Sequence, residues 1–210
     1  MKALLMALTL VSVYIVPASG QSKPEQSTTK PEWTEADRKY LLDNLIRSKE
    51  ELLAETKNLT KEQWDFKEAP DRWSINQVVE HIALYEVIFM NEIAVALQMG
   101  PFPDFAFHDP DSNFVDQDPK GLKQNNTTDF TKPFTITVPL GNNEGEHNLA
   151  WVTKMRGESI EFIKTETRNM RAHYINFGPN VHQKCMMIFA HSDRHLRQIK
   201  KVKAHSDYPN

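Results

Sequence analysis

Four stretches of the chain place apolar residues three or four positions apart, with polar residues between them. This spacing puts the apolar side chains on one face of an α-helix. No stretch gives a convincing series of alternating strand positions. The pattern therefore predicts an all-α fold, a four-helix bundle with a long connection between its second and third helices.

The first two predicted helices have clear starting signals. The first begins at Thr34, where Asp37 completes a capping box, and should end near residue 58. The second begins at Ser74, with Gln77 in the box position, and should end near residue 99, before a Gly-Pro pair. Its inward face is expected to carry Val78, His81, Tyr85, Ile88 and Val95.

The third helix is expected over about residues 148–170 and the fourth over about residues 181–204. Lysines in the last turn of the fourth helix suit the negative end of its dipole. The apolar stripe of this helix consists of Val181, Ile188, Ile199 and Val202. His191 and His195 fall inside the same stripe, so two imidazoles are expected at inward positions.

Two buried imidazoles one turn apart need polar partners or a shared ion. An unpaired buried polar group costs about 1 to 3 kcal/mol, and residues four apart lie side by side on a helix. His81, also inward, can supply a third nitrogen, and three imidazoles with an open coordination position are typical of catalytic metal sites. Because the chain has eight histidines, a chance pair of core histidines is the alternative.

Other polar residues have simpler interpretations. Tyr85, one turn from His81, is the candidate for a residue that supports the ligands without binding the ion, with core packing as its alternative. Glu80 and Glu86 lie off the His81 stripe and are expected to be solvated, and Cys185 is expected to be a small core residue. The remaining histidines are expected to be solvated or to cap helices: His108, His147, His173, His182 and His205.

Composition narrows the classes of function. The formal charge is −3 and 40% of the residues are hydrophobic, so nothing global predicts nucleic-acid binding. The single cysteine excludes a disulfide framework within the chain.

The first residues have the order of a secretory signal peptide. Residues 1–20 contain Lys2, an apolar run of 14 residues, a proline and small residues. The run is shorter than the roughly 20 residues of a spanning helix. We therefore expect an exported chain, periplasmic or secreted, with the signal cleaved and no stable membrane insertion afterwards. Residues 21–32 have the composition of a flexible spacer, and residues 33–206 should form one bundle domain.

Two motifs, RWSINQVVEHI at residues 72–82 and HSDRHLRQIKKVK at residues 191–203, resemble the DinB/YfiT-like superfamily of metalloenzymes. The shared features are a Trp-Ser helix start, a Glu-His pair, and a His-x-x-x-His followed by Gln-Ile. The resemblance implies a four-helix bundle with a divalent metal held by His81, His191 and His195. The sequence does not choose between zinc, nickel, iron and manganese, because imidazole suits several divalent ions.

Two hypotheses of function follow from this resemblance. Members of the superfamily include thiol-dependent transferases and isomerases, which implies an exported metal-dependent enzyme with transferase or hydrolase chemistry on an unknown small molecule. Export weakens the thiol-dependent version, because low-molecular-weight thiols are not normally plentiful outside the cytoplasm. The alternative is a non-enzymatic binding or stress-response protein whose metal is structural or absent. A homodimer is compatible with both hypotheses.

The connection over residues 100–146 is unusually long and carries six phenylalanines among prolines and acidic residues. It includes a β-like segment at residues 133–140. Connections of this length are usually functional coverings or disordered segments, and we expect this one partly to cover the open side of the metal. The alternative is a surface crossover packed elsewhere, because His81 lies in the first half of its helix and the connection leaves from the far end.

Overall fold

The structure, a computed structural model, describes residues 32–102, 109–115, 135–176 and 178–210. Within these residues the fold is all-α, as the sequence predicts, with four long helices and no strand. The predicted signal peptide, and the predicted spacer except for its last residue, lie outside the described residues, so both stay predictions.

The helices follow one another as α1, Glu35–Glu55; α2, Lys61–Asp65; α3, Ile75–Met99; α4, Gly145–Thr165; and α5, Val181–Lys203. Two 3₁₀ turns belong to the long connection: η1, Asp111–Phe114, and η2, Thr135–Thr137. The predicted β-like segment is therefore a 3₁₀ turn followed by chain without regular secondary structure, as far as its described residues show. The short helix α2 was not expected.

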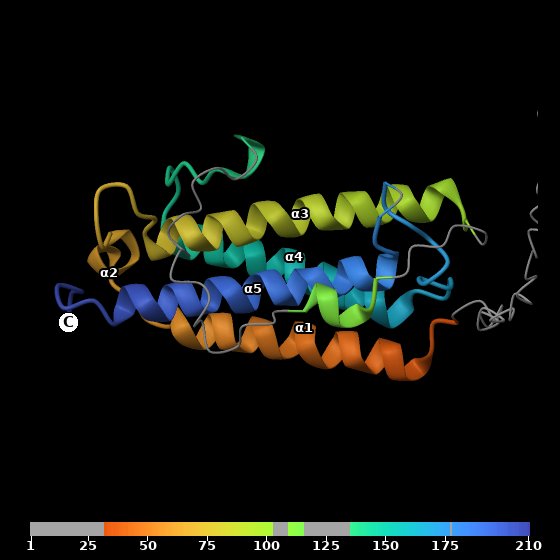
Figure 1. Ribbon diagram of the computed structural model, residues 1–210. Coiled ribbons are helices and arrows are strands. Elements are labelled where there is room, and N and C mark those ends of the chain that lie inside the picture. The colour runs from red at the N-terminus through yellow and green to blue at the C-terminus, as the bar shows by residue number, and fades with distance from the viewer. Residues whose placement is uncertain (1–31, 103–108, 116–134, 177) are drawn as a thin grey trace, which may run out of the picture.

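The four long helices lie side by side as a bundle (Figure 1). Both α1 and α3 contact α4 and α5, so α1 and α3 stand on one diagonal of the bundle. Helices α3 and α4 run in the same direction, opposite to α1 and α5. After α3, which has 25 residues and is about 37 Å long, the chain must return along the bundle before α4 can begin. This parallel step explains the long connection.

Side-chain caps set the helix starts where the sequence carries the signal. The boxes at Thr34 and Ser74 are both present, and α2 and α5 begin after further boxes at Thr60 and Asn180. Helix α4 instead begins at Gly145 rather than near residue 148, and its cap residue makes no side-chain cap bond. Gly145 is required there, because an added Cβ would lie 2.1 Å from the ring of Trp64.

The core face of α3 differs from the predicted stripe. Its buried apolar residues centre on Ile82, and Val95, expected to point inward, is 56% exposed. His81 lies about 100° round the helix from Ile82, so it stands at the border of the core, toward α5.

Among the described residues, α3 is the one helix that is long and apolar enough to cross a membrane, by length and composition only. A core helix passes the same test, and α3 buries Glu86 and His81 within the bundle.

A buried arginine joins all four long helices. Arg156 of α4 donates to Glu86 of α3 at 2.6 Å, and both side chains are almost fully buried. Its terminal nitrogens donate to Ser48 of α1 at 2.5 Å and to Ser192 of α5 at 2.8 Å. The prediction that Glu86 is solvated is wrong, because this carboxylate accepts from Arg156 and from Ser159.

A second polar cluster anchors η1 at the opposite end of the bundle from α2. Arg171 bridges Asp37 of α1 and Asp111 of η1 at 2.8 and 2.7 Å. His182 is only 1% exposed, with Nε2 3.5 Å from Asp111, and its Nδ1 accepts from Trp33 at 3.3 Å.

Five histidines were expected to be solvated or to cap helices. Two of them are buried instead, and one lies outside the described residues. His182 is buried because η1 covers the start of α5, and His173 is 5% exposed beside the carbonyl of Ala96. Both predictions are wrong, since a chain segment far away in sequence supplies the cover. His147 is exposed as expected, His205 is half-buried, and His108 lies outside the described residues.

We predict that Arg156→Met lowers the free energy of unfolding by about 3 to 5 kcal/mol, because it leaves the Glu86 carboxylate buried without its charged partner. Chemical denaturation followed by circular dichroism measures this value. The matched control is Lys154→Met on the same helix, whose ion pair with Glu158 is exposed and should contribute less than about 1 kcal/mol. Equal losses for the two variants would contradict the joining role of Arg156.

Acid should weaken the anchor at Asp37. Burial opposes ionisation of this carboxyl, but hydrogen bonds from Arg171 and Thr34 outweigh it and lower its pKa from 3.8 to about 2. The contribution of Asp37 to stability is therefore complete above pH 3.8 and lost as the pH falls through about 2.

We predict that the free energy of unfolding of the wild type falls by about 1 kcal/mol more than that of Asp37→Asn between pH 5 and pH 2. Denaturation at a series of pH values measures the difference. Asp43→Asn, at an exposed pair with Lys39 on the same helix, is the control and should follow the wild type. A wild-type curve parallel to that of Asp37→Asn would refute the assignment.

Candidate metal centre

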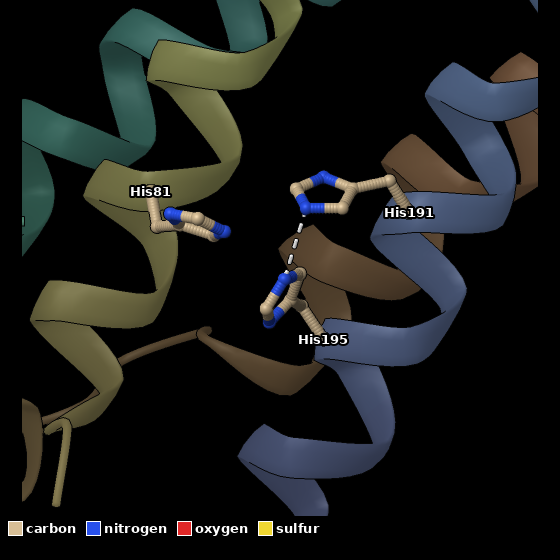
Figure 2. A group of neighbouring side chains, drawn as sticks. All are labelled: His81, His191 and His195. Atoms are coloured by element: carbon tan, nitrogen blue, oxygen red, sulfur yellow. Dashed lines mark hydrogen bonds between the residues drawn. The ribbon is translucent and has the colours of Figure 1, made fainter. Parts of the chain in front are cut away.

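Three histidines from two antiparallel helices converge inside the bundle. His81 comes from α3, and His191 and His195 come from successive turns of α5 (Figure 2). One ring nitrogen from each residue lies within 4.8 Å of those of the other two. His81 and His195 are 2% and 0% exposed, and His191 is half-buried. The structure thus brings together the three residues that the spacing singles out.

Hydrogen bonds outside the cluster determine which nitrogens face one another. His81 Nδ1 lies 2.7 Å from the carbonyl oxygen of Thr137, which can only accept, so this nitrogen carries the proton. His195 Nδ1 likewise donates to Oε1 of Gln198 at 2.9 Å. In both rings the lone pair therefore resides on Nε2. Partners of this kind orient the ligands in metalloprotein sites and fix their tautomers.

The two imidazoles of α5 meet nitrogen to nitrogen. Nε2 of His191 and Nε2 of His195 are 3.0 Å apart. Since His195 Nε2 holds a lone pair, His191 Nε2 donates its proton there when no ion is bound. Two nitrogens bound to one zinc ion at about 2.0 to 2.1 Å stand about 3.3 Å apart in tetrahedral geometry. The observed separation of this pair is close to this value, and the ligand nitrogens of all three residues lie within 4.8 Å of one another, so the group could hold one ion once its members move closer together.

The surroundings keep all three imidazoles neutral near pH 7. Burial lowers the pKa of His81 to about 4; Arg194 adds to the effect and the Thr137 hydrogen bond opposes it. Burial and the neighbouring imidazoles, with Arg194, also hold the pKa of His191 and of His195 well below the usual 6.5. Metal ions bind neutral imidazole, so this cluster has the protonation state that coordination requires.

Aromatic rings enclose the three histidines. The ring of Trp73 lies 4.8 Å from that of His81, and the ring of Tyr85 lies 4.4 Å from that of His191. Phe89 extends this wall along α3, with its ring 6.0 Å from His191. Tyr85 contacts the rings of two candidate ligands, His81 and His191, and donates no hydrogen bond to them in the described structure. The wall limits the access of water and lowers the local dielectric constant.

Sequence reasoning missed several of these neighbours. Trp73 was interpreted only as part of a helix start, and Gln198 only as part of a family motif. Gln198 could have been found, because a polar residue three positions after His195 can reach its ring. Thr137 could not have been found, since its carbonyl reaches His81 only after the chain has returned along the bundle.

The acidic residues and the cysteine near the cluster have other roles. Glu80, expected to be solvated, is 7% exposed, because its carboxylate accepts the backbone N–H groups of Leu140 and Gly141. Glu92 pairs with Lys184 of α5 at 2.6 Å. Cys185 is fully buried in the core, as expected, and burial raises the pKa of its thiol.

The described part of the long connection does reach the cluster. Residues 137–141 lie against His81 and Glu80 at the start of α3, so the distance between His81 and the departure point of the connection is no obstacle. Residues 103–108 and 116–134 lie outside the described structure. Cover of the open side of the ion therefore stays a prediction.

Comparison with known families agrees with the arrangement. The sequence model of the DinB superfamily matches residues 44–199, which include all three histidines and parts of all four long helices. The chain belongs to the DinB superfamily. Neither a curated protein nor a solved structure matches it. The superfamily domain carries here a group of three histidines that could hold a metal ion.

Trp73 should report occupation of the cluster. We predict that one equivalent of Ni²⁺ or Co²⁺ quenches part of the tryptophan emission, because these ions quench nearby fluorophores and Trp73 contacts His81. Trp73→Phe should remove most of this change. Trp33→Phe, which alters a ring beside His182, is the matched control and should keep it. Loss of the quenching in Trp33→Phe instead would place the ion elsewhere.

Proposed function

We propose that this DinB-superfamily protein is a metal-dependent enzyme whose single divalent ion is held by His81, His191 and His195. The observation that supports this proposal most directly is the convergence of three imidazoles, two of them buried and one half-buried, whose ligand nitrogens lie within 4.8 Å of one another. The tautomers of His81 and His195 support it further, because each ring already directs a lone pair away from its hydrogen-bond partner.

The ligand set leaves room for chemistry. When bound, a divalent ion with three imidazole ligands offers an open coordination position and lowers the pKa of a water or thiol there. The protein's residues orient the imidazoles through Thr137 and Gln198, and Trp73 and Tyr85 enclose the site. The reaction class that fits is hydrolysis or group transfer on a small molecule. Zinc, nickel, iron and manganese are all compatible with the ligands.

Two acidic residues of α3 that are close to His81 in the sequence, Glu80 and Glu86, are engaged in other contacts. Glu80 is engaged with the backbone of residues 140 and 141, and Glu86 with Arg156. The proposal therefore assigns activation of the nucleophile to the metal centre, and assigns binding and orientation to the aromatic wall. Tyr85 is the polar side chain of that wall nearest the imidazoles, at 4.4 and 4.7 Å between ring centres.

Metal analysis and an activity screen test this function together. We predict one divalent ion per chain in the wild type and a loss of most of it in His191→Ala, because two remaining imidazoles bind far more weakly. His147→Ala, at an exposed histidine outside the cluster, should keep the full content. Elemental analysis of purified protein measures the stoichiometry, and equal metal in the wild type and His191→Ala would refute the site.

The screen then offers metal-loaded protein a panel of esters, amides and thiol-acceptor pairs. A hydrolase or transferase should show turnover that a chelator removes and the ion restores, and that His191→Ala lacks. Full metal content without turnover of any substrate class would favour the non-enzymatic alternative.

A further inference from the structure

The last described part of the long connection forms a strap, residues 137–143, across the start of α3. The carbonyl of Thr137 accepts from His81, and the N–H groups of Leu140 and Gly141 donate to Glu80 at 3.2 and 2.7 Å. The carbonyl of residue 143 accepts from Asn76 at 2.8 Å. Three residues of one helix thus hold one segment by its backbone.

Pro139 is the one apolar residue within residues 136–140 that is buried. Ile136 and Leu140 are 71% and 70% exposed, and Val138 is 39% exposed. The opposite side of the segment is turned to the bundle, where Thr137 is fully buried. Because the large apolar side chains are exposed, the position of the strap depends on its polar bonds to α3 together with the burial of Thr137 and Pro139. Glu80 accepts two of these hydrogen bonds with its carboxylate, and hydrogen bonds to a charged acceptor are stronger than those between neutral groups.

Glu80 and the candidate ligand are neighbours in sequence and act on neighbouring parts of the strap. The Glu80 carboxylate accepts the N–H groups of residues 140 and 141, while His81 donates to the carbonyl of Thr137, three residues before Leu140. Without the two bonds to Glu80, Thr137 would be held less firmly, and the hydrogen bond from His81 Nδ1 to its carbonyl would weaken. The ring could then rotate or exchange its tautomer, and the lone pair on Nε2 would no longer be directed at His191 and His195.

We propose that Glu80 is a positioning residue for the metal centre, acting through the strap and Thr137 on the ligand His81. This inference rests on the proposed metal site. It implies that binding of the ion and docking of residues 137–143 support one another, because the same hydrogen bond favours both. A purely structural role for Glu80 would affect stability without affecting coordination.

The chain provides a matched control for Glu80. Glu166, at the end of α4, is also 7% exposed and also accepts two backbone N–H groups, those of Thr167 and Arg168 at 2.9 and 2.8 Å. Its hydrogen bonds in the described structure involve neither the strap nor the three histidines, so it separates the loss of a buried carboxylate from the loss of strap docking. Glu166 also pairs with the guanidinium of Arg168, so Glu166→Ala should cost at least as much stability as Glu80→Ala.

The test measures Zn²⁺ affinity by competition with a chromogenic chelator, together with the visible absorption of the Co²⁺-loaded protein. We expect Glu80→Ala to weaken Zn²⁺ binding about tenfold or more, to keep one ion per chain and to change the Co²⁺ spectrum. Glu80→Gln, which keeps one acceptor oxygen, should lie between Glu80→Ala and the wild type. Glu166→Ala should match the wild type in both readouts.

A variant in the strap itself tests the same hydrogen bond without changing any residue of helix α3. Gly141→Pro removes the N–H that donates to Glu80 and is incompatible with the local φ of +68°. It should weaken Zn²⁺ binding as Glu80→Ala does, and the double variant should be no weaker than either single one. Affinities and spectra equal to wild type in Glu80→Ala and Gly141→Pro would overturn the inference while leaving the metal site intact.

Equal weakening by Glu80→Ala and Glu166→Ala would also overturn it, since both would then act through general stability. A wild-type protein that binds no Zn²⁺ or Co²⁺ would instead refute the proposed metal site itself.

Discussion

A buried guanidinium determines how the four helices meet. Arg156 satisfies its donors only when α1, α3 and α5 each present an acceptor at the same level of the bundle. Sliding one helix along its axis would leave a buried charge without partners, which costs several kcal/mol. Ser192 directly follows His191, and Glu86 follows His81 by little more than one turn. The register that satisfies Arg156 is therefore also the register that brings the imidazoles together.

The parts of this structure that follow from local spacing could be predicted from the sequence. Capping boxes at Thr34 and Ser74 mark helix starts because their bonds span only three residues. The pair His191 and His195 is adjacent in any α-helix, and His81 needed only a second amphipathic helix opposite. The class of fold and the membership of the candidate cluster were accessible for this reason.

The parts that depend on the return of the chain could not be predicted. Glu80 looks solvated on a helical wheel and is buried only because a segment some sixty residues later crosses it. His182 is buried because η1 folds back over the start of α5. The stripe on α3 was centred on His81 instead of Ile82, since a helical wheel cannot tell the core face from a side later covered by another segment.

The contact between His191 and His195 bears on when the ion can enter. Each imidazole nitrogen in that contact has a partner before any metal arrives, as an N–H···N pair at 3.0 Å. The His191 N–H therefore has an acceptor even when no ion is bound. This differs from small domains that are unfolded without zinc. Assembly of the chain and binding of an ion could therefore be separate events. Three imidazoles also discriminate poorly among first-row ions, so the ion that such a centre takes up would depend on which ions are available where the chain folds.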